Sequence, residues 1–553
     1  MPRIVVLILA ALSLLTVSAA QAREAGFLMF GGPIHAVFDP GDPAPEALVV
    51  RDGKVAFVGR LAEARKLAGD LPEIDLQGAA AFPGFIDSHV HLTGVGMREM
   101  TLNLDQVSSV AELVAVAKAR DAAHPGAEPL TGRGWIETHW PEKRFPTRAD
   151  LDAISATRPI VLARSDGHAM VLNSTALALA GITRTTPDPA GGRIERDASG
   201  EATGMLIDTA QGLIRAKLPP MSYATRKEAL ARGTALYAAR GWARGVNMST
   251  AAEDVKALFE LAAEGRLPIR VDAFMTPEDS AEVLKWGPYA DKTGLVRVRG
   301  VKLYMDGALG SRGAALKAPY SDRPDTSGLV IAEHDPTLAI LNLALKVNAQ
   351  IAFHAIGDRG NRLVLDWMDE AFRAAAPDAA APVWRIEHAQ ILDPADVAAF
   401  RRRGIVASMQ TSHAIGDLYF APARLGEQRL DGAYAWRSLL DEGVVVAGGT
   451  DAPVEVGDPR IEFYAAAIRK DLQGRSGPDW RPEQALTRDE ALYLFTGAGA
   501  YAVMDRSAGA LKPGAVADIT VFSADILTIP EADIMAVRPL LTIVNGKIVS
   551  DRR

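Results

Sequence analysis

Short apolar runs alternate with amphipathic stretches over most of the chain. Residues 225–245 and 254–267 repeat apolar residues at intervals of three and four, which predicts helices lying on a core. The apolar runs between such stretches are too short for helices and indicate buried strands. Strand, helix and strand in succession predict βαβ units with a parallel sheet.

Counting the apolar runs gives eight expected strands. They are residues 80–91, 245–250, 269–275, 298–306, 350–355, 384–390, 405–410 and 444–451. Eight parallel strands with intervening helices predict an α/β fold of the (β/α)8 TIM-barrel type, here spanning residues 82–503. The gap from about residue 93 to 240 is too long for one helix, so we expect an inserted subdomain over the barrel mouth.

Both ends of the mature chain carry β-hairpin patterns. Residues 47–59 alternate around an Asp-Gly turn, and residues 540–550 alternate around Asn-Gly after the apolar run 517–525. Neither end is large enough to build a core alone. We therefore expect residues 23–81 and 504–553 to pair into one composite β-sandwich domain.

The first 22 residues differ from the rest of the chain. Arg3 precedes the apolar run IVVLILAALSLLTV, and small residues follow at Ala20 and Ala22, which predicts a secretory signal cleaved after Ala22. The run is shorter than the roughly 20 residues that span a bilayer, so an uncleaved anchor is the weaker alternative. Because the chain has no cysteine, disulfides and thiolate ligands are excluded, and we expect a periplasmic protein with no membrane attachment after cleavage.

Composition narrows the class of partner. The chain has 553 residues, of which 48% are hydrophobic and 23% charged, as in a folded globular protein. Its net charge of −8 supplies no basic field for phosphates, which argues against a nucleic-acid partner. A small-molecule substrate is expected, and a homo-oligomer stays open.

Polar residues cluster at the carboxyl ends of the expected strands, where barrel enzymes carry their chemistry. In the first strand His89 and His91 are two apart, so both face the barrel mouth and can bind one ion, with Asp87 beneath them. A lone His-x-His also fits buried structural histidines, but the full set favours a catalytic zinc site. The other members of this set are Lys302, His354, His388 and Asp451.

The segments PGFIDSHVH, VKLYMDGALGSRGA, FHAIGD, IEHAQ, GGTDAP and GALKPGAVADITVF resemble the amidohydrolase superfamily of metal-dependent hydrolases. GRGWIETHWP and SDGHAMVLNSTAL narrow the resemblance to its third family, typified by N-substituted formamide deformylases. The resemblance implies that His89, His91 and Asp451 bind one metal, and that His354 and His388 hold a second. It also implies a carboxylated Lys302 bridging both ions. GVNMSTAAE departs from the Gly-Val-Thr run of relatives, which leaves the substrate open.

A divalent ion, Zn²⁺ by preference, lowers the pKa of bound water from about 15.7 to about 7. Asp451 is then expected to accept the proton from water and return it to the leaving amine, although an aspartate in GGTDAP also suits a turn or N-cap. His168, in the insertion, is expected to reach the substrate carbonyl or to be an exposed structural residue. For Lys302, a salt bridge to Asp306 with a single metal is the alternative to a carbamate bridging two.

Further residues are candidates for substrate binding. Asp306 and Arg312 lie in the glycine-rich loop after the fourth strand, where a guanidinium suits a carboxylate, and His413 lies near the seventh strand. Trp135 and Trp140 line an apolar pocket or belong to a core. The remaining histidines are expected at the surface or in packing; they are His35, His124, His139 and His334.

The sequence thus predicts an exported, metal-dependent amidohydrolase of non-peptide carbon-nitrogen bonds, acting on a small amide, N-formyl or N-acyl compound. A dipeptidase or acyl-amino-acid hydrolase, and a lactone or ester hydrolase, use the same type of site and remain alternatives. A non-catalytic binding barrel is a third alternative, which a missing metal ligand would indicate.

Overall fold

The computed structural model describes residues 26–36, 44–105, 107–137, 140–165, 167, 169–189, 191–375, 382–477 and 480–553. The predicted signal segment, residues 1–22, lies outside these residues, as do His139 and His168. Within the described ranges, no helix combines the length and apolar character needed to cross a membrane.

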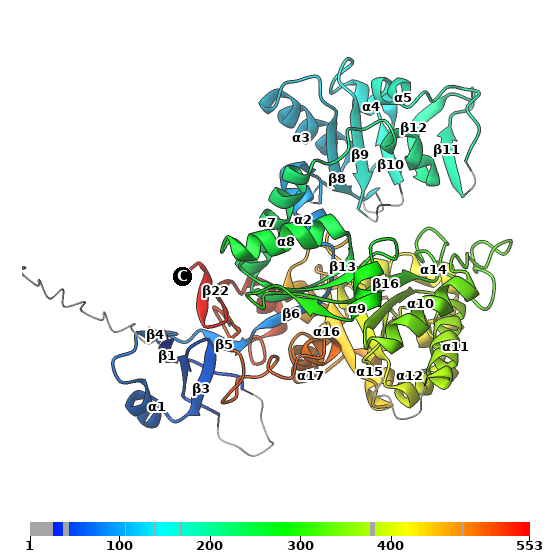
Figure 1. Cartoon of the computed structure of the whole chain (residues 1–553). Coiled ribbons are helices and arrows are strands. Elements are labelled where there is room, and N and C mark those ends of the chain that lie inside the picture. Colours follow the sequence, from blue (N-terminus) through cyan, green and yellow to red (C-terminus); the bar gives the residue numbers. More distant parts are fainter. Residues whose placement is uncertain are drawn as a thin grey trace, which may run out of the picture.

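Eight parallel strands form the predicted barrel, at the centre of Figure 1. In spatial order they are β6 (Phe85–Val90), β13 (Trp242–Thr250), β14 (Arg270–Met275), β16 (Val296–Tyr304), β17 (Gln350–Ala355), β18 (Arg385–His388), β19 (Val406–Gln410) and β20 (Val446–Gly449). The ring closes just beyond β20, where Asp451 N donates to the carbonyl of His89 at 2.7 Å and His91 N donates to the carbonyl of Ala452 at 2.8 Å. The (β/α)8 fold class is confirmed.

The first predicted strand, residues 80–91, is wrong in one respect, because the structure divides it at Gly84. β5 (Ala80–Pro83) leaves the barrel and pairs antiparallel with β21 (Ile519–Phe522) of the terminal domain. A Cβ at Gly84 would lie 2.7 Å from the Cβ of Ala243 and 2.8 Å from that of Asp518. Only glycine fits where the strand passes between the two domains.

Helices surround the strands, and their apolar faces join the barrel core. Those of the barrel are α8 (Ala252–Ala263), α9 (Ala281–Trp286), α10 (His334–Lys346), α11 (Asp358–Ala374), α12 (Val397–Arg403), α13 (Thr411–Asp417), α14 (Ala421–Leu425), α15 (Trp436–Asp441), α16 (Pro459–Ile468), α17 (Arg488–Leu494) and α18 (Gly497–Ala502). A short strand, β15 (Tyr289–Ala290), pairs antiparallel with β16.

The two chain ends contribute two four-stranded sheets. One has the order β3 (Lys54–Gly59), β2 (Ala47–Arg51), β1 (Gly26–Phe30), β4 (Glu73–Asp75), with α1 (Leu61–Ala68) against it, and the other has the order β23 (Lys547–Asp551), β22 (Pro539–Val544), β21, β5. Residues from both ends, among them Met29 and Ile543, share one buried cluster. Asn545 and Gly546 both have positive φ, as the predicted tight hairpin turn requires.

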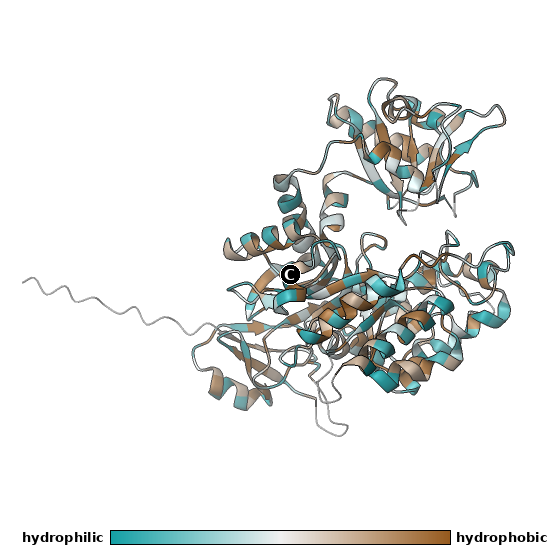
Figure 2. Cartoon of the chain, turned by 45° about the vertical axis from the view of Figure 1, so that its right-hand side comes forward, coloured by the Kyte–Doolittle hydropathy of each residue, from teal (hydrophilic) through white to brown (hydrophobic). Residues whose placement is uncertain are grey.

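The insertion forms a separate lobe above the barrel in Figures 1 and 2. Its sheet has the order β11 (Gly192–Arg196), β12 (Ala202–Asp208), β10 (Ala169–Leu172), β9 (Ile160–Arg164), β8 (Leu130–Trp135), β7 (Leu102–Asn103), and its helices are α3 (Val110–Ala123), α4 (Arg148–Asp152), α5 (Ser174–Leu179) and α6 (Gly212–Arg215). Two packed helices, α2 (Leu92–Met100) and α7 (Tyr223–Arg240), connect it to the barrel. They cross so closely that a Cβ at Gly96 would lie 1.7 Å from the carbonyl oxygen of Ala229.

Candidate metal centre

His89, in β6, and His91, directly after that strand, are held with the same ring nitrogen facing the barrel mouth. His89 Nδ1 lies 2.7 Å from Oε2 of Glu387, and His91 Nδ1 lies 3.2 Å from the carbonyl of Met248. An imidazole that donates from Nδ1 to an oxygen keeps a lone pair on Nε2, which is the metal-binding form. Both Nε2 atoms are therefore available as ligands.

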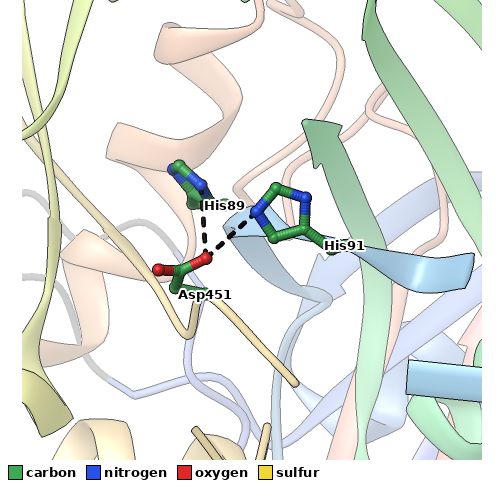
Figure 3. Close-up of side chains that lie close together, drawn as sticks. All are labelled: His89, His91 and Asp451. Atoms are coloured by element: carbon green, nitrogen blue, oxygen red, sulfur yellow. Dashed lines mark ion pairs between the residues drawn. The ribbon is translucent and has the colours of Figure 1, made fainter. Parts of the chain in front are cut away.

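Asp451 faces these two nitrogens (Figure 3). Its Oδ1 lies 3.5 Å from His89 Nε2 and 3.2 Å from His91 Nε2. Ligands about 2.1 Å from a tetrahedral ion are about 3.4 Å apart, so both distances from Asp451 Oδ1 match the spacing of two ligands on one Zn²⁺. Among the described residues, His89, His91 and Asp451 form a group of possible metal ligands whose ligand atoms all lie within 4.8 Å of one another.

The protonation states of these residues suit a cation. Burial, together with the positive charge of Lys302, lowers the pKa of His89 to about 3, so its ring is neutral at physiological pH. Burial opposes ionisation of Asp451, but the nearby His89 and His91 hold the pKa of its carboxyl well below the usual range. A neutral imidazole and an ionised carboxylate are the forms that coordinate metals.

Asp87 stabilises the backbone around the site through hydrogen bonds and is not among the described residues that line the cavity. Its Oδ1 accepts from the backbone N–H groups of His89 and Thr450, both at 3.0 Å, and its Oδ2 accepts from Tyr237 and Thr450 hydroxyls at 2.9 and 2.7 Å. Burial raises the pKa of this carboxyl to about 6. Asp87 thereby ties the first barrel strand to the segment that carries Asp451.

Sequence reasoning missed Glu387, the residue that orients His89. Its carboxylate binds His89 on one side and Arg385 on the other, with Arg385 Nε 2.5 Å from Oε1, and both charged side chains are fully buried. Burial alone would raise the pKa of Glu387, yet the Arg385 guanidinium and the His89 contact hold it below its usual range. The pattern Arg-x-Glu-His on a buried strand could have indicated this ion pair, since Arg385 and Glu387 are two residues apart and therefore face the same side of the strand.

His354 and His388 lie beside the first group, with ring centroids 4.4 Å apart, and the His388 ring is 4.9 Å from that of His89. His388 Nδ1 contacts Gln410 Oε1 at 2.7 Å, which leaves its Nε2 free of that contact. His354 Nε2 is buried and lies 3.5 Å from Oδ1 of Asp306, without a hydrogen bond among the described residues. Burial lowers the pKa of both rings well below the ordinary value, so both are neutral.

Lys302 is almost fully buried, with Nζ 3.5 Å from His89 Nε2 and 4.7 Å from the ring centroid of Tyr304. The alternative salt bridge to Asp306 is not formed. The Asp306 carboxylate instead accepts the backbone N–H groups of Ala315, Ile356 and Gly357 at 2.8 to 2.9 Å. No carboxylate of the described chain forms an ion pair with this lysine.

A cavity of about 700 Å³ lies between the barrel mouth and the insertion. Its barrel side includes the metal-centre residues with His413 and Arg312, and its insertion side includes Glu137, Arg164 and Asp208. His413 Nε2 lies 3.9 Å from Asp451 Oδ2 and 3.7 Å from Glu455 Oε1. His413 and Arg312 are thus placed where substrate contact is feasible.

Two candidate substrate residues are elsewhere, which corrects the sequence prediction. Trp135 is fully buried in the core of the insertion, where its Nε1 donates to the carbonyl of Leu162 at 2.9 Å and its ring packs 6.1 Å from Trp140. Asp306 is buried in the loop that follows β16, where its carboxylate accepts the three backbone hydrogen bonds described above. Its three backbone hydrogen bonds explain an acidic residue there without a ligand.

Three of the remaining histidines, His35, His124 and His334, are not among the described residues that line the cavity. His35 Nε2 lies 3.0 Å from Asp525 Oδ1 and joins the two chain ends. His334 contacts Asp335 and Glu370 at the surface, and His124 is an exposed residue at the end of α3. His139 and His168 belong to the residues that the structure leaves undescribed.

The fold and the site together define the class: a barrel hydrolase with a His/His/Asp group able to hold a divalent metal. The sequence profile of the amidohydrolase family matches residues 72–550, and the chain belongs to that family, as its motifs predicted.

Individual proteins agree with this assignment. YtcJ of Bacillus subtilis (strain 168), provisionally named an amidohydrolase, is 34% identical over 534 residues, which cover 94% of this chain and 99% of YtcJ. N-substituted formamide deformylase of Arthrobacter pascens is 26% identical, over 93% of this chain and 96% of the enzyme. The solved structure of an uncharacterized metal-dependent hydrolase from Pyrococcus horikoshii OT3 has a TM-score of 0.76 and 27% identity, over 92% of this chain and 99% of that one.

Proposed function

We propose that the protein hydrolyses a non-peptide carbon-nitrogen bond in a small amide, N-formyl or N-acyl compound. One observation carries the proposal: two separately oriented imidazole Nε2 atoms meet the same carboxylate oxygen of Asp451 at the spacing of metal ligands. The similarity to N-substituted formamide deformylase supports the choice of an amide substrate.

His89, His91 and Asp451 would hold a divalent ion, with Zn²⁺ favoured by the two imidazoles and one carboxylate. When bound, such an ion polarises a carbonyl and makes hydroxide available from water near neutral pH. His354 and His388, whose neutral rings lie 4.4 Å apart beside the first group, would hold a second ion. The donors present therefore fit the metal that the family implies.

Asp451 has two distinct oxygens for two tasks. Oδ1 faces both imidazoles, whereas Oδ2 lies on the side of His413 at 3.9 Å and borders the cavity. We assign Oδ2 the task of accepting a proton from the attacking water and passing it to the departing amine nitrogen. That second transfer is needed because an amide ion is a poor leaving group.

Lys302 is assigned the role of a carboxylated bridge. Its buried amine has no anionic partner among the described residues and adjoins an imidazole nitrogen turned toward the ion site. An ammonium there would oppose a cation, whereas a carbamate, formed when the neutral amine adds to carbon dioxide and loses a proton, supplies two oxygen ligands.

The test is hydrolysis of a panel of N-formyl amines, N-acyl amines, dipeptides, lactones and esters. Release of amine is measured for the first three classes, and release of carboxylic acid is measured for the lactones and esters. Protein loaded with Zn²⁺ should release amine from at least one formamide or simple amide, and chelated protein should not until Zn²⁺ is restored. Turnover confined to lactones and esters would reject the amide assignment. Absence of turnover throughout the panel would favour the binding-barrel alternative.

A further inference from the structure

Two arginines border the cavity and share one carboxylate. Arg312, in the loop after β16, places Nη2 2.7 Å from Oδ2 and Nε 3.1 Å from Oδ1 of Asp322. Arg424, on α14, donates from Nη1 to the same Oδ2. Both arginines line the cavity, whereas Asp322, within the described chain, does not. Two positive charges therefore face the cavity with a single negative charge behind them.

The guanidinium groups retain capacity for another anion. Arg312 uses Nε and Nη2 toward Asp322, so its Nη1 takes no part in those bonds. Arg424 directs Nε and Nη2 at the carbonyl of Gly310, where both bonds are long at 3.3 Å. Its guanidinium carbon lies 5.7 Å from the ring centroid of Phe420, which also lines the cavity. Planar guanidiniums on an apolar support bind carboxylates with geometric specificity.

Several other charged residues on the cavity wall have partners of their own. Arg164 and Glu137 pair with each other at 2.8 Å. Asp417 accepts hydrogen bonds from Gln390 and from the Tyr434 hydroxyl. Arg312 and Arg424 differ from these residues, because their two guanidiniums share the single carboxylate of Asp322.

The backbone at Arg312 gives independent support. Its φ is +64°, in the left-handed region that favours glycine, although glycines stand nearby at positions 310 and 313. Arginine therefore occupies a position where glycine would place less strain on the backbone. Strained non-glycine residues tend to occur at ligand-binding positions.

We propose that Arg312 and Arg424 form an anion subsite that binds a carboxylate of the substrate, at the opposite end from the bond that is cleaved. The inference rests on the proposed function and narrows its substrate class to small amides that carry a carboxylate, such as N-acylated amino acids. Asp322 then competes with the incoming anion for the two guanidiniums and so limits their affinity for it.

Kinetics with matched substrates test the subsite. N-acetylglycine and N-acetylglycinamide differ in having a carboxylate or a neutral amide at one end. Arg312→Gln and Arg424→Gln should each raise KM for N-acetylglycine about tenfold or more, the usual size of a charged hydrogen bond, and leave N-acetylglycinamide within about twofold. Asp322→Asn should lower KM for N-acetylglycine alone, because it frees both guanidiniums.

Two controls separate binding from folding. Arg312→Gly suits the left-handed backbone, so it should fold normally and still raise KM for N-acetylglycine. Arg323→Gln removes a nearby arginine that pairs with Asp325 at 2.8 Å and, among the described residues, is not part of the cavity wall; it should change neither KM. Equal effects of the arginine variants on both substrates, or a raised KM in Asp322→Asn, would overturn the proposal.

Binding measurements keep this test distinct from that of the proposed function. Calorimetry of Zn²⁺-loaded protein should show that N-acetylglycine binds more tightly than N-acetylglycinamide, and that Arg312→Gln abolishes the difference. This outcome without any turnover would reject the amidohydrolase proposal and retain the subsite. Amide turnover with equal affinity for both ligands would reject the subsite alone.

Discussion

Replacing Glu387 by Gln tests two roles of one buried carboxylate, which are to orient His89 and to neutralise Arg385. Glu387 orients the metal-facing histidine, His89, at 2.7 Å and neutralises Arg385 at 2.5 and 3.1 Å, with all three side chains excluded from solvent. Glutamine keeps the shape and one acceptor oxygen but removes the charge. Breaking a buried ion pair by neutralising one partner costs about 3–5 kcal/mol, and the retained hydrogen bonds place this case near the lower value. Losing the carboxylate behind a metal-binding histidine lowers metal affinity about 10- to 100-fold.

The two effects have different readouts. Urea unfolding of metal-free protein measures the lost stability, and competition with a chromophoric chelator measures Zn²⁺ affinity. The double variant Arg385→Met with Glu387→Gln removes both charges, so it should recover much of the stability while its Zn²⁺ affinity stays low. A Glu387→Gln protein that binds Zn²⁺ as tightly as the wild type would refute the orienting role.

Two further predictions concern buried ionisable groups. Lys302→Ala should lose most bound metal and activity, with partial recovery in short-chain carboxylic acids and bicarbonate; a variant that keeps one ion, when the wild type also holds one, would contradict a bridge. Burial raises the pKa of Glu462 to about 8, so the folded chain retains a proton that the unfolded chain releases above about 4.5. Stability from this group is present at low pH and is lost as pH rises toward 8, by up to about 1.4 kcal/mol per pH unit. Glu462→Gln should remove this pH-dependent loss of stability. If the urea midpoint of the variant still shifts between pH 5 and pH 8 as it does in the wild type, Glu462 is not the group responsible.

Much of the centre could be predicted because parallel barrel strands end at one rim. Residues far apart in sequence, such as His89, His354 and Asp451, therefore converge once the strands are counted correctly. The family motifs then indicated which of them bind metal. Neither argument needed a side-chain position.

The rest depends on tertiary contacts that periodicity does not encode. Asp306 resembles a substrate residue in sequence, but its oxygens are used by backbone N–H groups about nine and fifty residues away. For Trp135 the sequence allowed a pocket or a core and favoured the core, and the packing of the insertion decides between them. The division of the first strand at Gly84 reflects a close approach of two domains, which a continuous apolar run conceals.

The most direct test of the central claim is the rate of amine release by Asp451→Asn protein whose metal content has been measured in the same sample. Asparagine preserves the size and one coordinating oxygen but cannot accept the proton. We predict that the variant retains metal while turnover falls about a hundredfold or more, the usual contribution of an acid-base residue. Near-normal turnover in metal-replete Asp451→Asn protein would contradict the account.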